Sequence, residues 1–484
     1  MGVKSEMEQN RLQTANNNEL ATTAFYYHQS EIFIENGADT TANRTKFSYQ
    51  RRYDYTPKGN RFAVAAIADN VIFEGGIAKN PKNQWQWSAT YRNLSIKDTT
   101  AIIPNLPDNK AANSTFLAGI THNLAALKGM LRTNTQYQIG TGQRQITEIY
   151  YQKVDVGRGN YIWQDANNNG VEETGEFLLA SQNDALLANY VQIILPTTNY
   201  QTTNIVQWNE SLNITPRAYF ANAKGGLKLL NLLSWQTVWQ LRRETFAAQS
   251  RFIDFAPFGV PTPDSIIVSQ NNNLRNTLFV NRNSPKYELT FYGFNSITQN
   301  FLVNGTDTRR RNEWSAKAKI GISTKFTADL SAIWGNNAAQ STAFIQQNYA
   351  IRQFSTEPSL SFTPNKNWRA SASFKYKYSI DTLQDEAKPA IVNQLSADMR
   401  YGSAAKRSVS ARFSYAIVSY TGANNSPAAY TLLEGLQTGN NFLWNLTFDT
   451  QLSNNTQLNI MYDGRKTGDN PINHIGRVGI RAMF

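Results

Sequence analysis

A loop of oxygen-bearing side chains is the clearest candidate for ligand binding. Residues 165–176 read DANNNGVEETGE, which is the spacing of a calcium-binding EF-hand loop. The expected ligands of a structural calcium ion are Asp165, Asn167, Asn169, the backbone carbonyl of Val171, Glu173 and Glu176. Position eight is Glu172 instead of an apolar residue, and the flanking residues look like strands. An asparagine- and glycine-rich turn that binds no metal is therefore the alternative.

Nine basic residues fall on the polar faces of alternating segments in the C-terminal part of the chain. They are Lys317, Lys319, Arg369, Lys375, Lys377, Arg400, Arg412, Arg477 and Arg481. The same faces carry four acidic residues, Asp329, Asp398, Asp449 and Asp463. If the apolar faces contact lipid, these polar faces line a lumen that favours anionic solutes. Cross-strand ion pairs in a wet or plugged lumen are the alternative.

Few residues of this chain are suited to catalysis. It has no Cys, and its three His residues, His28, His122 and His474, lie far apart in the sequence. No P-loop and no Gly-x-Ser-x-Gly motif occurs. We therefore expect no enzymatic activity and no cofactor apart from calcium. The net charge of +12 permits an anionic partner, but we interpret Arg242–Arg243 and Arg309–Arg311 as solvated or headgroup-facing charges, not as nucleic-acid contacts.

Alternation of apolar and polar residues predicts the elements that hold these side chains. In residues 368–378, WRASASFKYKY, the side chains of Trp368 and Tyr378 fall on one face, and those of Arg369 and Lys375 fall on the other. This segment has about the length that a tilted strand needs to cross a bilayer. The same pattern recurs at 206–214, 287–291, 314–322, 326–334, 395–401, 409–417, 442–448 and 458–462.

Short and long links alternate between these segments from residue 283 to the end. Short links are expected at 283–285, 323–325, 363–367, 402–406 and 453–455. Long polar links are expected at about 296–312, 335–356, 380–392, 421–440 and 464–473. Outer-membrane barrels have short periplasmic turns and long extracellular loops, so this order favours a membrane barrel over a soluble all-β protein.

The composition agrees with a barrel and excludes other classes. Aromatic residues make up 12% of the chain, which is too many for a disordered protein. No stretch of about 18 apolar residues occurs, which excludes a membrane-spanning helix. The mean hydropathy of −0.48 is compatible with barrel strands, because their two faces average out. Aromatic residues at the ends of the expected strands predict interfacial girdles: Trp314, Trp334, Trp368, Tyr378, Tyr401 and Trp444.

The last residues, 474–484, read HIGRVGIRAMF and are expected to form a final strand. Four of them resemble the terminal-strand signal that the outer-membrane barrel assembly machinery reads: Arg477, Gly479, Ala482 and Phe484. Ala482 is smaller than the residue usual at its position. Residues 1–20 contain no apolar core of a signal peptide. Because an exported barrel needs one, we interpret the sequence as a fragment.

Three stretches resemble the C-terminal parts of large, mostly uncharacterised Bacteroidota outer-membrane and surface proteins. They are 159–170 followed by Glu176 and Phe177, then 430–444, and 462–466 with the final RAMF. The resemblance spans about residues 140–484. It implies a location in the outer membrane of a Gram-negative cell and a truncated chain, and it implies no reaction.

The sequence therefore predicts an all-β, antiparallel transmembrane β-barrel of the outer-membrane type, with about 12–14 strands or more. We expect a poorly defined segment over 1–80, a β-rich region over 81–200 and the barrel over 201–484. The expected function is a passage or export-related channel or transporter component. The alternatives are the membrane anchor of a surface-display or adhesion scaffold and the C-terminal barrel of a TonB-dependent receptor. Expected partners are outer-membrane lipid, the barrel assembly machinery and an anionic solute, with no nucleic acid.

Overall fold

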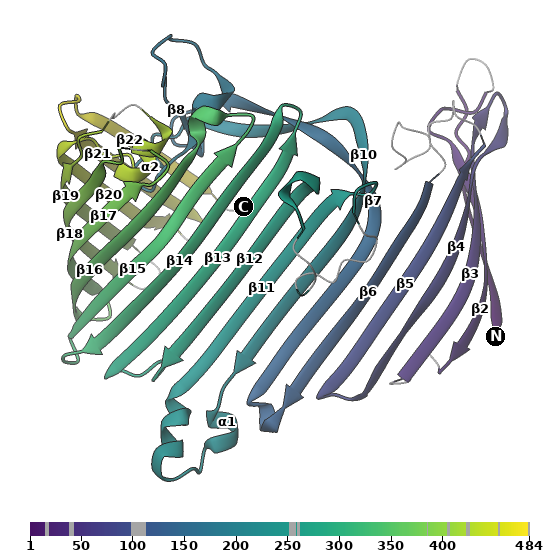
Figure 1. Ribbon diagram of the computed structural model, residues 1–484, viewed down its shortest axis with the longest axis horizontal. Helices are drawn as coiled ribbons and strands as arrows, with labels where there is room; N and C mark the ends of the chain where they lie inside the picture. Colours follow the sequence, from purple (N-terminus) through teal and green to yellow (C-terminus); the bar gives the residue numbers. More distant parts are fainter. Residues whose placement is uncertain are drawn as a thin grey trace. The chain divides into compact units, whose positions relative to one another are not determined.

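Antiparallel strands make up most of the computed structural model of the protein (Figure 1). The structure describes residues 1–14, 19–37, 43–97, 113–250, 258, 262–384, 386–403, 407–422, 426–453 and 455–482. Within these residues it has 22 strands, two short α-helices and five 3-10 turns.

The elements have the following bounds. The first ten strands are β1 (Gly2–Asn10), β2 (Phe25–Asn36), β3 (Asn43–Lys58), β4 (Arg61–Asn80), β5 (Asn83–Ile96), β6 (Asn113–Ala126), β7 (Leu131–Lys153), β8 (Tyr161–Trp163), β9 (Phe177–Leu179) and β10 (Tyr190–Ile214). The next six are β11 (Leu233–Phe246), β12 (Ile267–Val280), β13 (Tyr287–Leu302), β14 (Gly305–Gly321), β15 (Phe326–Ser341) and β16 (Tyr349–Asn365). The last six are β17 (Trp368–Asp381), β18 (Pro389–Ser403), β19 (Arg407–Ser419), β20 (Gly439–Ser453), β21 (Thr456–Thr467) and β22 (Asn473–Ala482). The helices are α1 (Arg217–Phe220) and α2 (Pro427–Leu433), and the 3-10 turns are Leu127–Gly129, Thr174–Glu176, Gly225–Leu232, Asp264–Ile266 and Ile345–Gln347.

Two compact units are built from separate parts of the chain. Unit 1 comprises Met1–Ile146, Pro196–Tyr219 and Thr237–Asn272, and unit 2 comprises Thr147–Leu195, Phe220–Gln236 and Asn273–Phe484. In unit 1, each strand from β1 to β7 pairs antiparallel with the next. In unit 2, the same holds from β13 to β22. Each unit therefore contains an up-and-down meander, which is the strand order of a membrane barrel wall.

The predicted apolar faces come into register across neighbouring strands of unit 2. Trp314, Ala316, Ala318 and Ile320 of β14 lie opposite Trp334, Ala332, Leu330 and Ala328 of β15. We call this side of the unit 2 sheet the apolar face. Its large side chains are exposed, as Trp314 at 51% and Leu330 at 50% illustrate. In water such a continuous apolar surface would be unfavourable, whereas barrel strands present one to the acyl chains of a bilayer.

Aromatic residues form two rows on this apolar face. Trp314, Trp334, Phe354 and Tyr378 occupy successive register positions from β14 to β17. The other row contains the register pairs Phe326–Phe362 and Trp368–Tyr401. Ten residues of β17 separate Trp368 from Tyr378, which corresponds to about 33 Å of strand. At a tilt of about 40° the rows lie about 25 Å apart along the bilayer normal, which is the height of the apolar band of a membrane barrel.

The long link predicted at 296–312 is wrong. β13 continues to Leu302 and β14 begins at Gly305, so only Val303 and Asn304 connect these strands. The polar residues Arg309–Arg311 break the apolar alternation, yet they pair in register with β13. Ladder hydrogen bonds use backbone groups only, so strands extend beyond the apolar band with any side chain. For the same reason the link predicted at 335–356 is reduced to residues 342–348.

Strands also occupy the chain before residue 200. β10–β22 number thirteen, within the range expected for the C-terminal part, and β1–β9 precede them. In unit 1, Ile32, Tyr49, Val71 and Tyr91 occupy successive register positions and are all exposed. The all-β, antiparallel barrel class is therefore confirmed, and the division into 1–80, 81–200 and 201–484 stays a prediction. No described helix is both long enough and apolar enough to cross a membrane.

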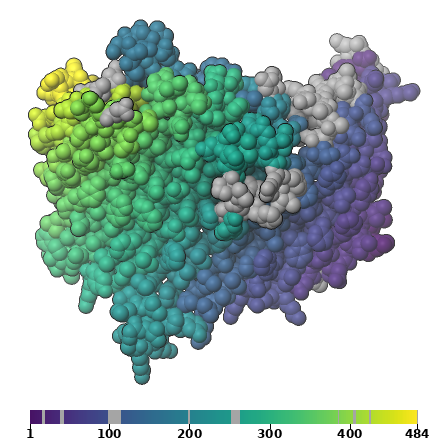
Figure 2. Space-filling model, in the orientation of Figure 1, coloured from purple at the N-terminus to yellow at the C-terminus, as the bar shows by residue number. Residues whose placement is uncertain are grey.

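In the space-filling view, the green part of the chain, which belongs to unit 2, forms a continuous surface (Figure 2). Successive side chains of a strand point to opposite faces of its sheet. In β18, Leu395 is exposed on the apolar face, whereas its neighbour Gln394 lines a cavity on the other face. The two faces of this strand therefore lie in different environments, one exposed and apolar and the other lining a polar cavity.

Replacing Leu395 with Arg is expected to destabilise the protein in phospholipid vesicles by about 2–4 kcal/mol, because the guanidinium would lie within the hydrocarbon. Denaturant unfolding of the vesicle-inserted protein, followed by Trp fluorescence, measures the change.

The matched control is Ser396→Arg, which places the same side chain on the polar face opposite the uncharged Ser373 and Ser414 and is expected to change stability by less than about 1 kcal/mol. Equal effects of the two substitutions would contradict the assignment of the apolar face to lipid.

Candidate functional site

A polar cavity of about 1090 Å³ lies on the face of the unit 2 sheet opposite the apolar face. Period-two alternation places every second residue of β16–β20 on this cavity-lining face. Its basic residues are Arg311, Arg369, Lys375, Lys377, Arg400, Arg412 and Arg465. Its acidic residues are Glu357, Asp398, Glu434 and Asp463. Residues 181–183 and 186–187 complete the lining together with Thr431 and Glu434, from outside the strands.

Helix α2 and the residues after it form a short structured segment, residues 426–437, which we call the α2 segment. The Ser426 hydroxyl accepts a hydrogen bond from the backbone N–H of Ala429 at 3.1 Å, and Pro427 follows at the first helical position. Both features favour a helix start here. The helix ends where Glu434 and Gly435 adopt positive φ angles of 54° and 76°. A side chain at position 435 would overlap the carboxylate of Asp184, so this turn needs glycine.

The apolar side of the α2 segment packs against the strand wall. Leu432, Leu433 and Leu436 are almost completely buried. They form one cluster with Ile351, Ala390, Val392, Ala416 and Val418 from β16, β18 and β19. Burying a leucine side chain contributes about 1.5–3 kcal/mol, so this contact holds the segment firmly against unit 2.

Glu434 connects the α2 segment to strand β17 by two ion pairs. Its carboxylate lies 2.7 Å from Nζ of Lys375 and 2.9 Å from Nζ of Lys377. The side chain of Lys377 is only 4% exposed, and its Nζ also donates to the carbonyl of Leu432 at 3.3 Å. Burial raises the pKa of Glu434, but the charges of Lys377 and Lys375 outweigh it and lower the pKa to about 2. Glu434 is therefore ionised at neutral pH.

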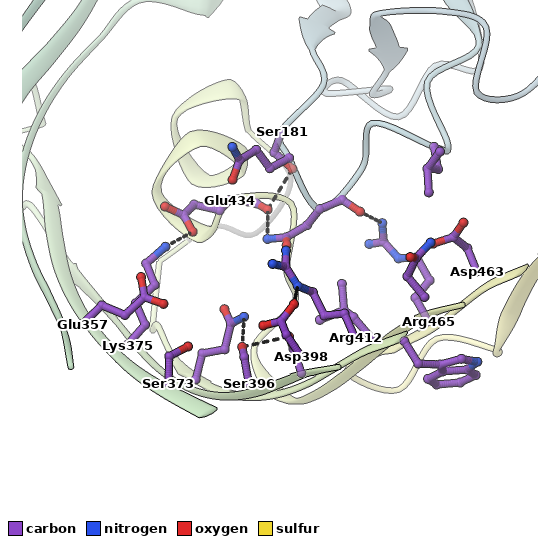
Figure 3. Close-up of a pocket in the computed structure, with 18 of the residues that line it drawn as sticks. Ser181, Glu357, Ser373, Lys375, Ser396, Asp398, Arg412, Glu434, Asp463 and Arg465 are labelled. Carbon is purple, nitrogen blue, oxygen red and sulfur yellow. Dashed lines mark hydrogen bonds and ion pairs between the residues drawn. The ribbon is translucent and has the colours of Figure 1, made fainter. Parts of the chain in front are cut away.

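A second contact joins the α2 segment to residues 181–184. The Ser181 hydroxyl and the Asn183 side-chain amide donate to the backbone carbonyl of Glu434 at 2.8 and 2.9 Å. Asp184 pairs with Arg465 of β21 and accepts a hydrogen bond from the Tyr430 hydroxyl at 2.7 Å. Burial and the Asp184 charge raise the pKa of Tyr430. Figure 3 shows Ser181 and Glu434 across the cavity from Ser396 and Asp398.

The structure brings together five of the nine basic residues predicted to line a lumen: Arg369, Lys375, Lys377, Arg400 and Arg412. Lys317 lies 3.8 Å from Asp329, and Lys319 is the register partner of that residue. Arg477 donates to the carbonyl of Val156 at 2.7 Å, and Arg481 lies opposite Gln457. A lumen lined by these residues stays a prediction, since the cavity belongs to unit 2 alone.

Two basic residues of the cavity, Arg311 and Arg465, were missed by the sequence analysis. Both fall in stretches predicted as long links, 296–312 and 464–473, but the structure places them in β14 and β21. An acidic residue two positions away, Glu313 for Arg311 and Asp463 for Arg465, was the signal in the sequence that each arginine lies on a polar strand face. Arg311 pairs with Glu313 two residues later on the same strand face, at 2.5 Å.

The calcium-like loop is a single closed turn in the structure. Asp165 accepts hydrogen bonds from the backbone N–H groups of Asn169 and Gly170, at 3.1 and 2.8 Å. Asn167 and Asn169 donate their side-chain amides to Glu173. Val171 donates its N–H to the side chain of Asn169 at 2.7 Å. The predicted ligand residues thus lie in one turn.

Glu176, the predicted bidentate ligand, is 2% exposed and accepts hydrogen bonds from Trp163 Nε1 at 2.9 Å and from the N–H of Ala166 at 3.0 Å. Among the described residues, no three His, Cys, Asp or Glu side chains converge to hold a metal ion. Calcium would have to replace N–H donors around these carboxylates, and its binding here stays a prediction.

The predicted assembly signal falls on β22 in part. Arg477, Gly479 and Ala482 pair with Met461, Asn459 and Thr456 of β21. Phe484 lies outside the described residues. Recognition by the assembly machinery therefore stays a prediction.

Each of the three imidazoles bonds to a different partner. His28 bonds to Ser5, His122 to Asn83 and His474 to Tyr462, at 3.0, 3.0 and 2.9 Å. Each pair joins residues of neighbouring strands.

Comparisons with known proteins give structural likeness only. No protein-family model and no curated protein matches the sequence. The chain is similar to the ferric enterobactin receptor PfeA of Pseudomonas aeruginosa, with 9% identity and a TM-score of 0.29 over 95% of this chain and 74% of that one. It is similar to the ferric-catecholate import receptor Fiu of E. coli K12, with 9% identity and a TM-score of 0.33 over 95% and 72%. For OmpT, an outer membrane protein of Vibrio cholerae, the identity is 7% and the TM-score 0.26 over 88% and 93%. TM-scores this low carry no argument about function.

Replacing Glu434 with Gln is expected to loosen the α2 segment, because Lys377 would remain buried without a carboxylate while the leucine contacts stay in place. Breaking such a buried pair costs about 3–5 kcal/mol. This cost corresponds to an increase of about 100-fold or more in the equilibrium constant for opening of the segment. The rate of protease cleavage within residues 426–437 measures this change. The double variant Lys377→Met/Glu434→Gln removes both charges and should stay close to the wild type.

The pH dependence checks the same contact in the wild type. The pKa of Glu434 is lowered from 4.5 to about 2, so its stabilisation is complete above about pH 4.5 and is lost as the pH falls through about 2. Pepsin cleavage of the segment should be low at pH 4 and rise toward pH 2. Release of the wild-type segment between pH 7 and 4 would show that the ion pairs do not hold it.

For the loop at 165–176, the sequence predicts saturable calcium-dependent heat in a calorimetric titration at up to millimolar calcium. Glu176→Gln should abolish that heat. Glu172→Gln is the matched control, since Glu172 bonds to the Tyr190 hydroxyl and is not a predicted ligand. A wild-type titration without calcium-dependent heat would refute the prediction.

Proposed function

We propose that this chain is an outer-membrane β-barrel protein that gives anionic solutes passage along the cavity-lining face of unit 2. The observation that carries the proposal is the charge of the cavity, whose lining has seven basic and four acidic side chains. Glu313 and Asp184, which are not lining residues, pair with two of these basic residues. Counting them leaves seven basic against six acidic groups, a net charge of +1 that favours anions.

The polar character of the lining also supports passage. Ser371, Ser373, Ser396, Ser410 and Ser414 line the cavity among the charged residues. Hydroxyl groups solvate an ion without binding it tightly, which lets a solute both enter and leave. An apolar lining would instead exclude hydrated ions.

The α2 segment gives the proposed passage a gate. It is held by Glu434 on one side and by the contact of Asp184 with Tyr430 on the other. Glu434 lines the cavity, and Asp184 and Tyr430 are chain neighbours of the lining residues Asn183 and Thr431, so release of the segment would widen the path. We propose that the closed form described by the structure conducts weakly.

Location and partners belong to the same proposal. Exposed apolar faces and two aromatic rows support insertion into the outer membrane of a Gram-negative cell, with its lipid as a partner. The partial match of β22 to the terminal signal supports delivery by the barrel assembly machinery. A non-enzymatic role is part of the same proposal.

One observation favours a second function, the membrane anchor of a surface-display or adhesion scaffold. The α2 segment is held by a buried apolar cluster as well as by ion pairs. A cavity closed so firmly also suits a barrel that only anchors another part of a protein. The origin in Bacteroidota and a TonB-dependent receptor as the parent protein stay predictions.

Reversal potentials in planar bilayers under a KCl gradient test the proposal. The wild type is expected to conduct weakly with anion preference, and Glu434→Gln is expected to raise the conductance several-fold with the same preference. Cation preference in both proteins would contradict an anion passage. No conductance in either protein, with the segment shown to be released by proteolysis, would favour the anchor.

A further inference from the structure

Two arginines of the cavity face each other directly across neighbouring strands. Arg369 of β17 and Arg400 of β18 are register partners, and both line the cavity. Side chains at directly opposite positions have Cβ atoms about 4.5–5.5 Å apart, and like charges there are destabilising. The pair therefore lowers the stability of the sheet unless an anion lies between the two guanidiniums.

The other basic residues of the cavity each have a carboxylate partner. Arg311 pairs with Glu313, Lys375 and Lys377 with Glu434, Arg412 with Asp398, and Arg465 with Asp184. Within the described part of the chain, neither Arg369 nor Arg400 forms an ion pair. Arg369 donates to the hydroxyl of Ser361 at 3.3 Å. Among the described residues, Arg369 and Arg400 are thus the basic residues of the cavity without an ion pair, whereas Lys375 and Lys377 share the one carboxylate of Glu434.

Nearby carboxylates are engaged elsewhere. Asp398 lies two residues from Arg400 on the same strand face and pairs with Arg412 of β19. Asp449, on β20, accepts hydrogen bonds from Ser408 and Asn459 at 3.2 and 2.6 Å. The group of Arg369, Arg400, Arg412 and Asp398 therefore carries a net charge of +2, from three cations and one anion.

We propose that Arg369 and Arg400 bind a phosphate group, free or carried by a small solute; this inference rests on the proposed function, because it names the anion that the cavity passes. A phosphate monoester carries about −1.5 to −2 charges at pH 7, which matches the local charge. Each guanidinium offers a planar fork of N–H donors that fits two phosphate oxygens.

Hydroxyl groups complete the proposed site. Ser410 is the register partner of Arg400 on β19, and Ser371 follows Arg369 on the same face of β17. Both side chains line the cavity and can donate hydrogen bonds to phosphate oxygens. Chloride would use the charge of this group but not its forked donors, so the site prefers an oxyanion.

Calorimetric titration of the full chain, folded in a phosphate-free detergent, tests the site with inorganic phosphate, glycerol phosphate and chloride as probes. We expect phosphate to bind more tightly than chloride. The double variant Arg369→Gln/Arg400→Gln should weaken phosphate binding by about tenfold or more. Stronger binding of glycerol phosphate than of inorganic phosphate would identify a phosphorylated solute, and the reverse would identify free phosphate.

The matched control is Lys317→Gln/Lys319→Gln, which removes the same charge from β14 and should leave phosphate affinity within about twofold. Folding of the variants is checked by unfolding in denaturant. Without phosphate, Arg400→Gln should be at least as stable as the wild type, since a like-charge contact is removed.

Equal phosphate affinity of the wild type and the arginine double variant would overturn the site, as would equal affinities for phosphate and chloride. If bilayers show anion preference but phosphate binding does not depend on these arginines, the passage stands and this site falls. If phosphate binding depends on the arginines but the bilayers show no anion preference, the site stands and the passage falls.

Discussion

The requirement that every backbone polar group be paired governs this structure. In hydrocarbon no water can satisfy a free N–H or C=O group, so strands that cross a membrane must pair with neighbours along their whole length. The ladders from β1 to β7 and from β13 to β22 meet that demand for the strands that have a neighbour on both sides, such as β2–β6 and β14–β21. Once the ladder is set, side chains alternate between the two faces, and this alternation separates the lipid-contacting residues from those of the cavity.

The strict alternation also explains what the sequence could and could not predict. Faces such as Trp314 to Ile320 and Trp368 to Tyr378 were readable because two environments leave a period-two pattern. Strand ends were not readable where polar residues extend past the apolar band, and Arg311 was lost to a predicted loop for that reason. The backbone pairs equally well there, but no apolar face remains to mark the strand.

Most of the basic residues of the candidate site could be predicted from the sequence, but the position of the α2 segment beside them could not. Arg369, Lys375, Lys377, Arg400 and Arg412 follow from alternation alone. The α2 segment does not, because its position depends on contacts between residues far apart in sequence. Lys377 meets Glu434, and Arg465 meets Asp184, only after the strands are assembled. No local spacing in the sequence encodes such partners.

The contacts of residues 155–187 with β21 and β22 have a consequence for the order of assembly. Arg465 holds Asp184, and Arg477 donates to the carbonyls of Val156 and Gly157. These arginines lie about 300 positions later in the chain. Contacts between residues so far apart in sequence form slowly. Until β21 and β22 are paired, the polar groups of residues 155–187 that these arginines bind remain solvated and open to proteases, so formation of the β21–β22 hairpin is the event that protects them.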